Sequence, residues 1–135
     1  MYTVEAVIER ADDGTFDVYC TKEIFSGMGK TIDEAKQKMQ EQMVFYRETA
    51  IREGFKYPEF LDHPYEIQYS VDSLSLMKYY VLSGIFTLSG MEKVTGINQK
   101  QLWAYMKGTK PRKKQLNRIE AGFLSLQKDL NAMFA

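Results

Sequence analysis

The stretch GINQKQLWAYMKG, residues 96–108, carries the strongest local signal in the chain. It starts and ends with glycine, and Asn98 is a residue type that caps the start of a helix. The preceding segment, residues 88–95, has the pattern of a short helix that Thr87 or Ser89 can cap. Two short helices joined by a tight, glycine-containing turn are the helix-turn-helix pattern.

The second helix of this pair, expected at residues 99–107, has the side chains of a DNA-reading helix. Leu102, Tyr105 and Met106 are expected to face the core, which leaves a polar face outward. Glutamine can bond adenine edges, lysine can bond guanine, and a small alanine permits close approach or contact with a thymine methyl. The helix start, with its free N–H groups, is an expected phosphate site. The residues expected to contact DNA are Gln99, Lys100, Gln101, Trp103, Ala104, Lys107, Lys110, Arg112 and Lys113.

Trp103 has three possible roles in this segment. It can pack between domains, stack against the DNA backbone, or cover part of Leu102. We favour packing, because a large aromatic side chain gains most from burial.

The charges of the chain are unevenly divided, although the net charge is +0. Residues 1–72 contain 8 Lys/Arg and 15 Asp/Glu, whereas residues 73–135 contain 10 Lys/Arg and 3 Asp/Glu. A basic half is typical of proteins that bind a polyanion, and the asymmetry indicates two units with different partners. The alternative is that the two halves only attract each other.

The composition excludes several classes of protein. With 135 residues and 44% hydrophobic content, the chain is long enough for one ordinary domain or two very small ones. Cys20 is the only cysteine and His63 the only histidine, so we expect no internal disulfide, no metal site and no cofactor. The chain shows neither a signal peptide nor a membrane span, so we expect a cytoplasmic protein without membrane contact.

The first 72 residues predict a small α+β unit with the order ββ(β)αβ. Residues 2–9 and 15–20 alternate apolar and polar side chains and form a hairpin, and residues 24–30 give a possible third strand. A helix follows from the cap at Thr31, and residues 65–71 alternate again as a strand.

The remaining residues, 73–135, predict an all-α domain. Residues 73–84 form its first helix, and the last helix has Pro111 in its first turn. The apolar residues of that last helix are spaced by three and four, which fits docking on the bundle or pairing with a second copy of the chain. They are Leu116, Ile119, Phe123, Leu126, Leu130 and Met133.

Residues 73–122 resemble the Xre/lambda-repressor type of helix-turn-helix, through GINQKQLWAYMKG and the KP that follows. The resemblance implies base contacts at Gln99, Lys100 and Ala104, with Gln101 and Trp103 nearby. One difference is Glu92, at a position where that class usually has a small residue.

The first unit resembles the HicB antitoxins, through YTVEAVIERADDGTFDVYC and GMGKTIDEAKQKMQEQM. The resemblance implies a degraded RNase H-like fold for residues 1–72, followed by a DNA-binding domain at residues 73–135. It also implies binding to a small HicA-like ribonuclease toxin, which would be basic. Finally, it implies repression of the protein's own operon by a dimer or higher oligomer on a pseudo-palindromic DNA site.

Two other functions compete with this expectation. In the first, the helical unit only dimerises and the acidic unit binds a partner. In the second, Glu5, Glu9 and Asp17, on neighbouring strands, bind two metal ions for nuclease chemistry. Solvated acids on an open sheet face explain the same pattern, so we expect no catalysis.

Overall fold

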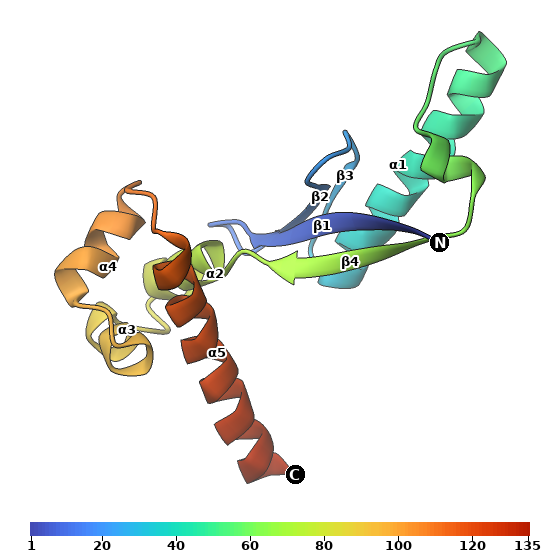
Figure 1. Cartoon of the computed structure of the whole chain (residues 1–135). Coiled ribbons are helices and arrows are strands. Elements are labelled where there is room, and N and C mark those ends of the chain that lie inside the picture. Colours follow the sequence, from blue (N-terminus) through green and yellow to red (C-terminus); the bar gives the residue numbers. More distant parts are fainter. The chain divides into compact units, whose positions relative to one another are not determined.

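The computed structural model describes residues 1–135, and the chain is α+β, with one mixed four-stranded sheet and five α-helices. It divides into two compact units, Met1–Asp72 and Ser73–Ala135 (Figure 1). Each unit has its own cluster of buried apolar side chains. None of the helices combines the length and the apolar character needed to cross a membrane.

The sheet of the first unit has the strand order β3-β2-β1-β4. β1 and β2 are antiparallel, as are β2 and β3, whereas β4 runs parallel to β1 along the other side. The strands are β1 (Tyr2–Arg10), β2 (Phe16–Cys20), β3 (Ser26–Gly29) and β4 (Tyr65–Val71).

The alternation of β1 and β2 is confirmed by burial. Val4, Ala6 and Ile8 are buried on one face of β1, and Val18 and Cys20 continue that face on β2. The Sγ atom of Cys20 lies 3.9 Å from the Sδ atom of Met39. Burial, and then the nearby charge of Glu23, raises the pKa of the Cys20 thiol. Cys20 is therefore a core side chain and not a reactive thiolate.

Helix α1 (Ile32–Glu53) covers this apolar face. Its start is capped as predicted, because Thr31 Oγ1 accepts a hydrogen bond from the Glu34 N–H at 3.1 Å. Gly54 ends the helix in the left-handed conformation, with φ 78°. Ala35, Met39, Met43 and Ala50, which recur at helical spacing, are buried, whereas Ile32 at the first turn is 37% exposed.

The two glycines of β3 allow helix α1 to pack closely against that strand. A Cβ atom at Gly27 would lie 2.3 Å from the Ala35 carbonyl oxygen, and one at Gly29 would lie 2.8 Å from the Ala35 nitrogen. Only glycine therefore lets the first turns of α1 pack directly on β3.

The segment between α1 and β4 contains the short 3-10 helix η1 (Glu59–Asp62). Phe60 inserts into the core of the first unit, where it contacts Tyr65 edge to face with ring centroids 5.1 Å apart. Asp62 Oδ1 accepts hydrogen bonds from Arg47 Nε at 2.8 Å and from the Tyr57 hydroxyl at 3.0 Å. The Arg47 bond, and then the Tyr57 bond, lowers the pKa of Asp62 below its ordinary value.

The second unit contains the remaining helices, α2 (Ser73–Leu82), α3 (Leu88–Thr95), α4 (Gln99–Met106) and α5 (Lys113–Phe134). Its core takes Met77 from α2, Met91 from α3, Leu102 and Tyr105 from α4, and Ile119 from α5. α5 begins later than predicted, because Arg112 is its N-cap and Pro111 precedes the helix.

The two halves of α5 differ in burial. Ile119 is fully buried, and Phe123 packs against the core. Leu130, Met133 and Phe134 are 57%, 81% and 85% exposed. The predicted apolar seam therefore docks on the unit only in its first half.

Candidate nucleic-acid interface

The turn between α3 and α4 is held in one conformation by its own side chains. Gly96 ends α3 with φ 73°, a conformation that favours glycine. The buried Thr95 hydroxyl donates to the Met91 carbonyl oxygen at 2.7 Å and accepts from the Ile97 N–H at 3.1 Å. Ile97 is itself buried at 2% exposure. The two helices are thus fixed relative to each other, as a reading helix requires.

Glu92 links the two helices across this turn. Its Oε1 atom accepts a hydrogen bond from the Gln99 N–H at 3.0 Å, and the Asn98 side chain accepts from the Lys100 N–H at 2.8 Å. These are two of the N–H groups that were expected to bind a phosphate. The carboxylate of Glu92 already supplies negative charge at this helix start. The predicted phosphate site therefore does not hold for these two groups.

Helix α4 presents its polar side chains outward. Leu102 is fully buried and Tyr105 is 3% exposed, while Met106 packs partly against the same core. This arrangement confirms the predicted inner face. Four of the predicted DNA contacts on α4 are exposed: Gln99, Lys100, Gln101 and Trp103. The fifth, Ala104, is partly buried.

Trp103 is not a core side chain of the second unit. It is 48% exposed, and the Nζ atom of Lys107 lies 4.9 Å from its ring centroid. A cation and an aromatic face at this distance attract each other. An aromatic ring and an ammonium group therefore lie together beside the polar face of α4.

A basic segment follows α4 directly. Gly108, with φ 118°, turns the chain, and the Thr109 N–H donates to the Ala104 carbonyl oxygen at 3.0 Å. Lys110, Arg112 and Lys113 are exposed and form no ion pair, since the ion pairs of the structure lie in the first unit. Arg112 caps α5 without using its side chain. All three cations are therefore available to an external anion.

Two features of this site were not predicted from the sequence. Lys93 is an exposed cation on α3, and its only sequence signal is its place in the basic half. Glu92 reaches Gln99 seven residues away, across a turn, and helical periodicity gives no signal for such a contact.

The first unit presents a different, acidic surface on the sheet face opposite α1. Glu9 and Asp17 are direct partners in the β1–β2 register, and Val7 pairs with Tyr19. Burial raises the pKa of the Tyr19 hydroxyl, and the charges of Glu9 and Asp72 raise it further. In the structure, no three or more His, Cys, Asp or Glu side chains group so as to hold a metal ion. The acids of this face, Glu5 among them, give it negative charge.

Comparison of this chain with protein-family models, with curated proteins and with solved structures found no match.

Proposed function

We propose that this protein is a sequence-specific DNA-binding repressor whose acidic unit binds a protein partner, as in an antitoxin. The observation that carries the proposal is the outward face of α4. Its polar residues are exposed on a helix whose inner side is fixed by Leu102 and Tyr105. A helix held in this way can enter the major groove and read base edges.

Each part of the interface has a role in this proposal. Gln99 and Lys100, in the first turn of α4, contact base edges, and Ala104 lies one turn further along. Lys107, Lys110, Arg112 and Lys113 bind phosphates and set the register. Four phosphate contacts from each copy, eight in a dimer, would give a slope of about −7 in a plot of log affinity against log salt.

The proposal requires a dimer, because one reading helix covers too few base pairs for a specific site. Two copies would place their α4 helices about 34–36 Å apart on a pseudo-palindromic site. The exposed half of α5, with Leu130, Met133 and Phe134, offers an apolar surface for the second copy.

The second activity in the proposal is binding of a small basic toxin, such as a HicA-like ribonuclease. The acidic sheet face of the first unit and the negative balance of residues 1–72 support it. Opposite charge on two surfaces speeds their encounter and disfavours wrong partners.

The deciding experiment is fluorescence anisotropy with labelled duplex DNA from immediately upstream of the protein's own gene. A scrambled duplex of equal length is the competitor, at two salt concentrations. We expect tight, salt-dependent binding that discriminates against the scramble. The triple variant Lys100→Glu, Arg112→Glu, Lys113→Glu should abolish it.

The control is Lys56→Glu, which makes the same kind of charge change at an exposed site of the first unit, outside α4 and the exposed half of α5. It should retain discrimination. Equal, weak binding to both duplexes by the unmodified protein would instead favour the helical unit as a dimerisation module only.

A further inference from the structure

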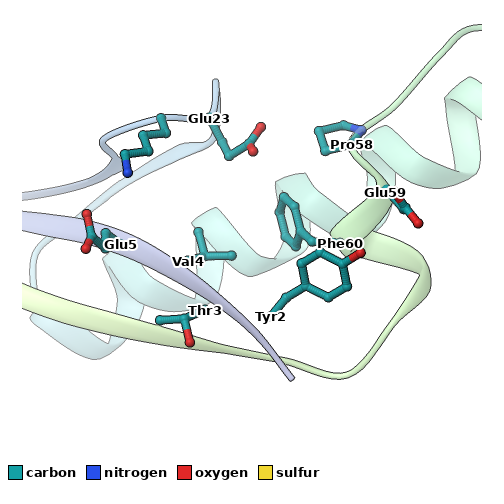
Figure 2. A pocket seen from close by; sticks show the side chains of 9 residues that line it. Tyr2, Thr3, Val4, Glu5, Glu23, Pro58, Glu59 and Phe60 are labelled. Atoms are coloured by element: carbon teal, nitrogen blue, oxygen red, sulfur yellow. The ribbon is translucent and has the colours of Figure 1, made fainter.

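The first unit has a cavity of about 530 Å³ beside the start of β1 (Figure 2). Val4 and Phe60 line it from the core side, and Tyr2, the first residue of β1, also lines it. Three carboxylates, those of Glu5, Glu23 and Glu59, and one cation, Lys22, also line it, so acidic groups outnumber basic ones. In Figure 2 the space lies between β1 on one side and the segments that carry Glu23 and Pro58 on the other.

The edge of β1 that borders this cavity is open. β2 pairs with β1 from Ala6 to Arg10, and Thr21, just after β2, still bonds to Glu5, so the edge without a neighbour on that side is Tyr2 to Val4. The Glu5 carbonyl oxygen accepts from the Thr21 N–H at 3.0 Å, which shows that Glu5 directs its backbone groups toward the β2 side. The Ile8 carbonyl oxygen accepts from the Asp72 N–H, so the even-numbered residues direct theirs toward β4.

Backbone groups alternate in direction along a strand, so Thr3 directs both its N–H and its C=O into the cavity. The Glu5 N–H points the same way. An extended segment placed there would continue the line of β2. If it ran antiparallel to β1, the residue opposite Thr3 would exchange two hydrogen bonds with it.

The side chains around the open edge define what that segment should contain. The residue opposite Thr3 would share its face, where Thr3 Oγ1 lies 3.4 Å from Glu66 Oε1 and where Glu5 also projects. A basic side chain fits this position. The residues on either side of it would point to the opposite face, toward Val4 and Phe60, where apolar side chains fit.

We propose that the Tyr2–Val4 edge of β1 is the docking site for an extended segment of a partner protein with the pattern apolar–basic–apolar. The partner adds a strand beside Thr3, beyond the point where Thr21 bonds to Glu5. This inference rests on the partner-binding half of the proposed function and is independent of DNA binding. Main-chain bonds supply affinity in such strand addition, and alternate side chains supply specificity.

The probe for the test is a capped synthetic peptide, Ser-Thr-Val-Arg-Val-Thr-Ser, titrated into the full-length ¹⁵N-labelled protein. We expect the largest shifts of amide signals at Thr3, Glu5 and Glu23. Methylation of the arginine backbone nitrogen keeps the charge but removes the hydrogen bond to Thr3, and should weaken binding by about tenfold or more. Replacement of the arginine by glutamate should abolish binding.

Two protein variants complete the test. Glu5→Lys should weaken binding of the arginine peptide by about tenfold, because it reverses the charge beside the basic side chain. Glu48→Lys makes the same charge change at an exposed site on α1 and should leave binding unchanged.

Two results would overturn the docking site at the edge of β1. One is binding that ignores nitrogen methylation, and the other is the absence of any shift at Thr3 and Glu5. If the shifts instead lie on Glu9, Asp17 and Tyr19, the partner does not dock at the edge of β1 but binds the acidic face of the sheet. Failure of the DNA experiment would leave this test unaffected.

Discussion

The substitution Glu92→Gln is expected to change the stability of the protein and its affinity for DNA in opposite directions. Glu92→Gln keeps an oxygen that can accept the hydrogen bond from Gln99, but it removes the negative charge. A hydrogen bond to a charged group contributes roughly 1 kcal/mol more than a neutral one, and the helix dipole adds up to about 1 kcal/mol. We therefore expect the free energy of unfolding to fall by about 1 kcal/mol.

For a unit of this size, that loss corresponds to a fall in Tm of about 4–8 °C. Glu92→Ala also removes the acceptor, and should lower the free energy of unfolding by about 2 kcal/mol. Circular dichroism at 222 nm during heating measures both variants. Glu120→Gln removes a charge at an exposed position on α5 and should leave Tm unchanged.

Glu92→Gln should bind DNA more tightly than the unmodified protein, although it is less stable. A charge about 10 Å from a phosphate interacts with it by about 0.4 kcal/mol in water, which predicts a gain in affinity of about twofold per phosphate. The gain should be largest at low salt and fade as the Debye length shortens. Anisotropy at two salt concentrations measures it.

Two outcomes would refute this reasoning. Weaker DNA binding by a folded Glu92→Gln protein would show that the start of α4 does not face phosphates. An unchanged Tm in both variants at this position would show that the hydrogen bond to Gln99 does not hold the two helices.

Three other predictions concern packing, pH and the aromatic side chain of the interface. Gly27→Ala should lower the free energy of unfolding by about 3 kcal/mol, because its Cβ would meet helix backbone; Gly90→Ala, whose nearest neighbour would lie 3.3 Å away, should not, and chemical denaturation compares them. Asp62→Asn should lower the free energy of unfolding at pH 7. The difference from the unmodified protein should disappear as the pH falls below 3.8 and through the lower pKa of the folded state, because only the ionised Asp62 carboxylate gives this stabilisation. Trp103→Ala should change the free energy of unfolding by less than about 1 kcal/mol and weaken DNA binding about fivefold. Since Trp103 is the only tryptophan, the fluorescence of the unmodified protein should change when it binds DNA.

Local periodicity predicted the elements of this chain well. The helix at 88–95 and the inward face of residues 4, 6 and 8 match the structure, because both patterns report the period of the backbone itself. The caps at Thr31 and Asn98 were also readable, since a cap acts within three residues of its helix.

Contacts between distant segments were not predictable in this way. Phe60 is buried from a segment that reads as a loop, and Gly27 is required by a helix turn eight residues further along the chain. The residues that we propose to contact DNA were singled out because basic and amide side chains cluster in sequence. The hydrogen bond from Gln99 to Glu92 was missed because the fold of the turn creates it.

The parallel pairing of β1 with β4 also bears on how the chain is made. Tyr2 pairs with Tyr65, so the first strand must wait for the last strand of its unit. At a synthesis rate of about 5–20 residues per second, this delay is on the order of 3–12 seconds. Until β4 is made, the side of β1 that pairs with it has no strand partner from its own unit. Chaperones, or a partner already present in the cell, have this interval in which to bind the strand before the sheet is complete.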